Sequence, residues 1–128
     1  IFGIILGVIL CSAEIASADI ANKNWSYSNY ASEAYTLWHK KDTNGNVYCY
    51  PYAGGKVYAT VGKSTNGGKT HSAASKKVKL NMGTKYTIVN SVGKNYARLK
   101  FNRVSTDGTV NSGYWSPDSS KNYTVVGK

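Results

Sequence analysis

The residues YARLKFNRVSTDGTVNSGYW, numbered 96–115, alternate between apolar and polar side chains on both sides of a central Asp107-Gly108 dipeptide. Alternation with a period of two is typical of a β-strand with one buried face, and Asp-Gly favours a two-residue turn between antiparallel strands. In the register that this turn sets, Phe101 lies opposite Tyr114. We therefore expect a core face with Ala97, Leu99, Phe101 and Tyr114, and an outer face with Tyr96, Arg98, Lys100 and Trp115.

Similar short runs, separated by Gly, Asn and Asp turns, continue through the chain from residue 34 onward. About eight strands at this spacing predict an all-β fold, a small antiparallel β-sandwich over residues 34–128, with a barrel as the second choice. Residues 19–33 are rich in Asn and Ser, and we expect an irregular N-terminal arm or an initial edge strand there. The expected strands are Ala34–His39, Val47–Tyr52, Lys56–Gly62, Lys76–Met82, Tyr86–Asn90, Tyr96–Ser105, Thr109–Trp115 and Asn122–Val126.

A second hairpin is predicted around a three-residue loop, Ala53-Gly54-Gly55, which would place Tyr50 opposite Tyr58. One face of this hairpin is then small and apolar and suits a core, with Cys49 buried and unreactive. Pro51 has no N–H group, so its strand is expected at a sheet edge. The inward set is Val47, Cys49, Pro51, Val57, Ala59 and Val61, and the outward set is an aromatic ladder of Tyr48, Tyr50, Tyr52 and Tyr58 beside Lys56 and Thr60.

The first eighteen residues have the order of a secretory signal peptide whose start is truncated. An apolar run (residues 1–10) precedes a short polar segment and the small-residue triplet Ala16-Ser17-Ala18, which predicts cleavage before Asp19. Cys11 as a lipidated cysteine and residues 1–18 as a buried element are the alternatives. Cleavage would leave Cys49 as the sole cysteine, so no intramolecular disulfide is expected.

Net charge suggests the kind of partner. The chain carries 16 Lys and Arg against 6 Asp and Glu, a formal charge of +10, with 11 Tyr and 3 Trp. Exposed strand faces carry much of this charge, because in residues 76–82 Val78, Leu80 and Met82 alternate with Lys77 and Lys79. Aromatic rings beside cations suit anionic cell-wall polymers, acidic glycans or membrane headgroups. We expect a secreted monomer that binds no nucleic acid, and the candidate binding residues are Tyr48, Tyr50, Tyr52, Tyr58, Lys56, Arg98, Lys100 and Trp115.

Signals for catalysis are few. His39 and His71 lack the spacing of a metal site, and His71 and Ser72 are neighbours that would point to opposite faces of a strand. The Gly67-Gly68-Lys69-Thr70 run lacks the spacing and the following helix of a phosphate-binding loop. We therefore expect no enzyme activity, catalytic residue, metal or cofactor.

The C-terminal half resembles a family of small secreted proteins of Gram-positive bacteria that is catalogued only as a domain of unknown function. The most specific piece is the S-G-Y-W-S-P-D run at residues 112–118. This resemblance implies an exported β-sandwich-like domain and supplies no activity. The run Gly68–Ala73 is also similar to a short motif of lactococcin-972-like bacteriocins.

Three functions follow as hypotheses. The first is a secreted, non-catalytic basic β-domain that binds anionic cell-surface or extracellular material. The second is a bacteriocin-like antimicrobial protein, although the sequence has no cationic amphipathic helix. The third is an extracellular hydrolase that uses His39 or His71.

Overall fold

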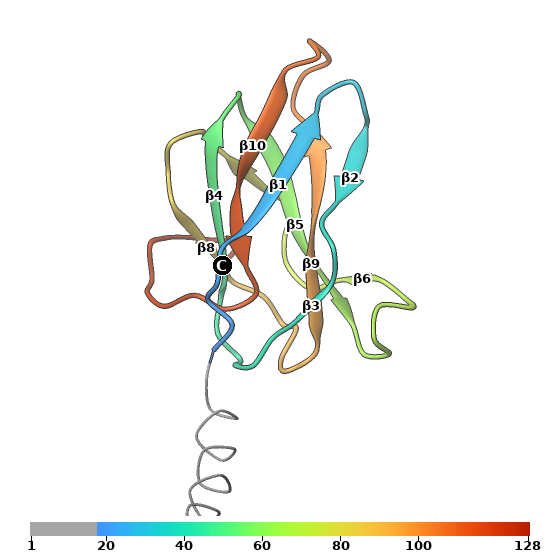
Figure 1. Ribbon diagram of the computed structural model, residues 1–128, viewed down its shortest axis with the longest axis vertical. Helices are drawn as coiled ribbons and strands as arrows, with labels where there is room; N and C mark the ends of the chain where they lie inside the picture. The colour runs from blue at the N-terminus through green and yellow to red at the C-terminus, as the bar shows by residue number, and fades with distance from the viewer. Residues whose placement is uncertain (1–17) are drawn as a thin grey trace, which may run out of the picture.

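The computed structural model describes residues 18–128, and this part of the chain forms two β-sheets packed face to face, without a helix (Figure 1). The predicted β-sandwich is therefore confirmed, because the sheets stay separate instead of closing into a barrel. Among the described residues, nothing helical is long and apolar enough to span a bilayer. The signal peptide predicted for residues 1–18 lies outside the described residues except for Ala18. The strands are β1 (Lys23–Ser28), β2 (Glu33–Tyr35), β3 (His39–Lys40), β4 (Val47–Ala53), β5 (Val57–Ser64), β6 (Ser72–Ala73), β7 (Val78–Leu80), β8 (Tyr86–Ile88), β9 (Tyr96–Arg103), β10 (Val110–Ser116) and β11 (Thr124–Val126).

The first sheet has the order β1-β10-β4-β8-β11, in which the β11–β8 pair is parallel and the other pairs are antiparallel. The second sheet has the order β2-β9-β5-β6, with β3 also paired to β9 and β7 to β5. Alternate residues of the long strands point between the sheets and form one core. The inward residues include the predicted Val47, Cys49, Val57, Ala59, Val61, Ala97, Leu99 and Phe101.

Both predicted hairpins are wrong, because β4 and β5 lie in different sheets, as do β9 and β10. Each connection crosses from one sheet to the other, so the two strands that it joins need not share a face. The Asp107-Gly108 turn therefore does not set the register of β10, which pairs with β1 and β4 instead. As a result Trp115, predicted to face outward, is 1% exposed in the core, and Tyr114, predicted to face inward, lies on the outer face.

Asn111 holds the connection between β4 and β5. Its buried side chain accepts a hydrogen bond from the Gly55 amide (2.8 Å) and donates to the Tyr27 carbonyl (3.1 Å). Gly54 has a φ of 103°, and a Cβ there would lie 2.7 Å from the Asn111 Cα, so only glycine fits this turn. The tight crossing thus takes the place of the predicted three-residue hairpin loop.

Of the two alternatives for residues 19–33, the edge strand is the one that forms, because this segment contains β1, at the edge of the first sheet, and the first residue of β2. Trp25 and Tyr27 alternate with polar residues along β1, and both rings are buried. The ring of Trp25 lies 4.3 Å from that of Phe101, between centroids, and its Nε1 donates to the Tyr114 carbonyl. Because Asn and Ser dominate this segment, the alternation of two aromatic residues with polar ones is a weak signal in the sequence.

Two smaller predictions fail at strand ends. Pro51 was expected at a sheet edge but lies in β4, an interior strand. The neighbouring strand β8 pairs only with Val47–Cys49 and ends before it reaches Pro51. On that side the Pro51 carbonyl accepts a hydrogen bond from the Gly83 amide instead (2.7 Å). Its missing N–H therefore removes no bond of the ladder. Met82 is 49% exposed, because β7 ends at Leu80 and the chain turns there.

A buried ion pair and the hydrogen bonds around it connect three segments of the chain: the residues before β1, those after β3 and those after β10. Lys41 Nζ lies 3.0 Å from Asp118 Oδ1, and both side chains are fully buried. The Asp118 carboxylate also accepts from the backbone amides of Asp19 and Asp42, and from the amide and hydroxyl of Thr43. Burial acts to raise the pKa of Asp118, but these hydrogen bonds outweigh it and hold the pKa below its usual value.

We predict that Lys41→Met lowers the free energy of unfolding by about 3–5 kcal/mol, because it leaves the buried Asp118 charge without its cation. Chemical denaturation at neutral pH measures this loss. The matched control is Lys40→Met, since Lys40 is exposed on β3, and a change within about 0.5 kcal/mol is expected there. Equal stabilities of the two variants would contradict the assigned role of the pair.

Candidate functional site

The predicted binding residues fall on opposite faces of the sandwich. Tyr48, Tyr50 and Tyr52 lie on β4 in the first sheet, whereas Tyr58 lies on β5 in the second. The predicted aromatic ladder is therefore divided between two surfaces. Arg98 and Lys100 lie with Tyr58 on the second sheet, Lys56 is exposed just before β5, and Trp115 belongs to the core.

Five tyrosines gather on the outer side of the first sheet, and we call this surface the tyrosine face: Tyr48, Tyr50, Tyr52, Tyr114 and Tyr123. Tyr114 of β10 pairs directly with Tyr50 of β4, so both side chains point to the same side. Ring centroids are 6.2 Å apart for Tyr50–Tyr52, 5.0 Å for Tyr52–Tyr114 and 5.2 Å for Tyr48–Tyr123. The rings thus form two groups on one side of the sheet, Tyr50–Tyr52–Tyr114 and Tyr48–Tyr123, and Tyr48 itself is buried.

Lysines border this face. Lys85 Nζ lies 5.5 Å from the ring centroid of Tyr50 and 5.7 Å from that of Tyr123, and Lys121 Nζ lies 5.9 Å from the latter. Lys85 and Lys121 are exposed, so each can contact a solvent-borne anion without leaving the aromatic rings. The face therefore offers cations and aromatic rings side by side.

A small, mainly polar cavity of about 160 Å³ lies at one end of the tyrosine face. Its wall combines aromatic rings, hydroxyl groups and one cation. Burial raises the pKa of Tyr48 above its usual value, so its hydroxyl stays protonated and can donate a hydrogen bond at neutral pH. The lining includes Asn22, Tyr48, Lys85, Ser116, Ser119 and Tyr123.

On the opposite sheet, Arg98 is enclosed by aromatic rings. Its guanidinium carbon lies 4.0 Å from the ring centroid of Tyr35 and 4.3 Å from that of Trp38, and its Nε donates to His71 Nδ1 (3.2 Å). Because two aromatic rings lie against the guanidinium and its Nε is hydrogen-bonded, its charge is less available to a ligand than predicted. Lys100 Nζ lies 3.6 Å from Glu33 Oε1, so this charge is also paired in part.

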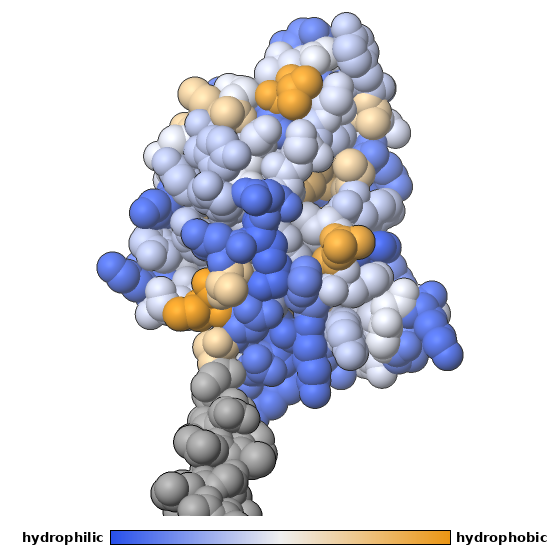
Figure 2. Space-filling view, in the orientation of Figure 1, coloured by the Kyte–Doolittle hydropathy of each residue, from blue (hydrophilic) through white to orange (hydrophobic). Residues whose placement is uncertain are grey.

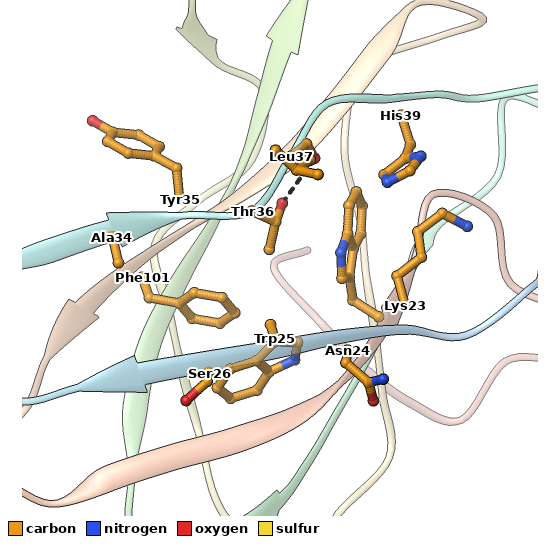
Figure 3. Close-up of a pocket in the computed structure, with 11 residues that line it drawn as sticks. Lys23, Asn24, Trp25, Ser26, Ala34, Tyr35, Thr36, Leu37, His39 and Phe101 are labelled. Carbon is orange, nitrogen blue, oxygen red and sulfur yellow. Dashed lines mark hydrogen bonds between the residues drawn. The ribbon is translucent and has the colours of Figure 1, made fainter.

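A larger cavity of about 300 Å³ opens at the edge of the sandwich, between β1 and the chain from β2 to β3 (Figure 3). Its floor is made of core aromatics, Trp25, Phe101 and Trp115, and Leu37, 79% exposed, lies at its rim. At this cavity the Leu99 amide of β9 donates its hydrogen bond to the Thr36 hydroxyl and not to a backbone carbonyl. The same hydroxyl donates to the Leu37 carbonyl.

The two histidines lie in different settings. The ring of His39 packs edge-on against Trp115, and burial and then the charge of Lys23 lower its pKa. His71 lies beside Arg98 on the second sheet. Within residues 18–128, no group of three His, Cys, Asp or Glu side chains is arranged to hold a metal ion.

Residues 12–119 match a family model described as Protein of unknown function (DUF2712). The chain belongs to this family. Searches of curated proteins and of solved structures each gave no match. Membership confirms the predicted likeness to a family of unknown function, and the matched range includes β1 to β10 and the buried Asp118.

Sequence reasoning missed several members of these surfaces, namely Tyr114, Tyr123 and Lys85 on the tyrosine face and Tyr35 and Trp38 around Arg98. Tyr114 was misassigned because the register of β10 was taken from a hairpin that does not form. The run Gly113-Tyr114-Trp115 offers one aromatic residue to each face, so its alternation alone does not decide which ring is buried.

We predict that His71 titrates below 6.5, because burial and the neighbouring Arg98 and Lys100 charges hold its pKa down. Stability linked to His71 is then complete above about pH 6.5 and falls as the pH decreases toward the folded-state pKa, since the unfolded chain binds the proton more tightly. NMR titration of the imidazole C–H signals measures this value. Arg98→Gln should raise the His71 pKa, and Arg103→Gln, at the other end of β9, serves as the control. A His71 pKa at or above 6.5 in the unsubstituted protein would contradict this.

Proposed function

We propose that this chain is an exported, non-catalytic module that binds an anionic, sugar-containing polymer of the cell surface through the tyrosine face. The observation that carries the proposal is the gathering of two groups of tyrosine rings on one side of the first sheet, with Lys85 close to both groups and Lys121 beside Tyr123. Net charge supports it, since +10 favours polyanions over neutral glycans.

The chemistry of such a polymer matches both parts of the surface. C–H groups of sugar rings pack on aromatic faces, and Tyr50, Tyr52 and Tyr114 offer these faces along two adjacent strands. Phosphate or carboxylate groups accept charge-assisted hydrogen bonds from Lys ammonium groups. The 160 Å³ cavity at the end of the face has room for a small part of one repeating unit, held by hydroxyls and by Lys85.

A polymer is favoured over a bilayer by the distribution of apolar residues. On the side of the molecule shown in Figure 2, strongly hydrophobic residues appear as separate spots, not as one continuous patch. Insertion below the headgroups requires a contiguous surface of such residues, which tyrosine rings alone do not supply. Membrane headgroups therefore become an alternative outcome of the binding test.

We predict that Tyr50→Ala weakens binding to purified wall teichoic acid about ten-fold, because truncating a central aromatic anchor costs about 1–2 kcal/mol. Titration calorimetry at low salt measures the Kd. The matched control is Tyr58→Ala, which removes the same ring from the opposite sheet and should leave the Kd unchanged.

Two further arms of the same experiment separate the alternatives. Binding should weaken as salt rises from about 0.01 to 0.15 M, because the Debye length falls from about 30 to 8 Å. Vesicles of phosphatidylglycerol and neutral dextran should bind less tightly than the wall polymer. Equal losses for Tyr50→Ala and Tyr58→Ala, or tighter binding to the vesicles, would overturn the proposal.

A further inference from the structure

The first described residues are attached to the buried Asp118 by two reciprocal bonds. The Asp19 amide nitrogen donates to Asp118 Oδ2 at 2.9 Å, and the Asp118 amide donates to the Asp19 carbonyl at 3.1 Å. The Asp19 side chain is fixed as well, because its Oδ1 lies 2.9 Å from Lys23 Nζ. Asp19 therefore occupies a defined position and is not a loose end, whereas Ala18 before it is exposed.

We propose that the chain is cleaved between Ala18 and Asp19, and that the new α-ammonium group of Asp19 forms a second ion pair with the buried carboxylate of Asp118. This inference rests on the export that the proposed function assumes, and not on the ligand. Hydrolysis adds one water to the peptide bond, leaving a carboxylate on Ala18 and an amine on Asp19. A signal-peptide-cleaving protease supplies the reaction, for which Ala16-Ser17-Ala18 is a suitable recognition triplet.

Only cleavage immediately before Asp19 places the new positive charge next to the Asp118 carboxylate. The nitrogen that becomes charged is the same atom that already lies at hydrogen-bond distance from Asp118 Oδ2, so the backbone need not move. Cleavage one residue earlier leaves a neutral amide at Asp19 and places the charge on the exposed Ala18. Cleavage one residue later removes the donor and both reciprocal bonds.

The surrounding charges favour an added cation at this nitrogen. Asp118 has Lys41 as its partner, and it is buried, so its attraction for a second cation is weakly screened. The other charged or titratable groups here are the Asp19 carboxylate, which is paired with Lys23, the exposed Asp42, and His39, whose neutral form is favoured by burial and by Lys23. The α-amine should therefore titrate above its ordinary range of about 7.7–8.0.

Two purified chains test the ion pair, one beginning at Asp19 and one at Ala18, each released from an N-terminal fusion by a protease that leaves the chosen residue. Both retain the Asp19 nitrogen as a donor, but only the first carries the charge on it. We expect the chain beginning at Asp19 to have the higher denaturation midpoint at pH 7. This difference should shrink as the pH rises through the folded-state pKa of its α-amine, because that pKa is raised and the stabilisation requires the protonated form.

Asp118→Asn in both chains completes a double-mutant cycle, and the difference between the chains should then disappear. Should these variants not fold, the pH dependence of the two unsubstituted chains decides the matter. Equal midpoints at pH 7, or a difference that does not change up to about pH 10, would overturn the ion pair. N-terminal sequencing of the protein released by its native host tests the processing step, and any first residue other than Asp19 would overturn it whether or not the polymer binds.

Discussion

The Asp118 carboxylate is the constraint on which the arrangement of this protein depends. A fully buried charge is tolerated only when it is paired and hydrogen-bonded, and Asp118 meets this requirement with donors from two other segments. Asp19 comes from the segment before β1, and Lys41, Asp42 and Thr43 come from the connection between β3 and β4. Chain segments about 75 to 99 residues apart are thereby held at one end of the sandwich.

This network also shapes the proposed binding surface. The Ser116 hydroxyl donates to the Asp118 carbonyl at 2.6 Å, and Ser116 lines the cavity beside Tyr48 and Tyr123. The chain that follows Asp118 carries Ser119, Lys121 and Tyr123 across the outside of the first sheet. Fixing Asp118 therefore fixes the end of the tyrosine face, so the buried ion pair and the proposed binding surface share one anchor.

Sequence patterns predicted the fold class and much of the core, but not which strands are neighbours. Leu99, Phe101 and Cys49 were assigned correctly, because a period of two states which residues of one strand share a face. Neighbours were misassigned because Asp-Gly and Gly-Gly turns indicate local hairpins, whereas here these connections cross between sheets. Burying Trp25 and Trp115 against Phe101 and the rest of the core requires that crossing, and local turn chemistry does not encode it. The site shows the same limit, since Tyr48, Tyr50 and Tyr52 were predicted but Tyr123 joins them only through the path fixed by Asp118.

A map of the bound surface tests whether the tyrosine face is where the polymer binds. Backbone amide shifts of ¹⁵N-labelled protein, followed by NMR during titration with wall teichoic acid, locate the contact residue by residue. We expect shifts concentrated on β4, on β10 and on residues 119–123, with β5 and β9 little changed. Shifts centred on Arg98 and Tyr58, or spread evenly over all exposed lysines, would contradict this expectation.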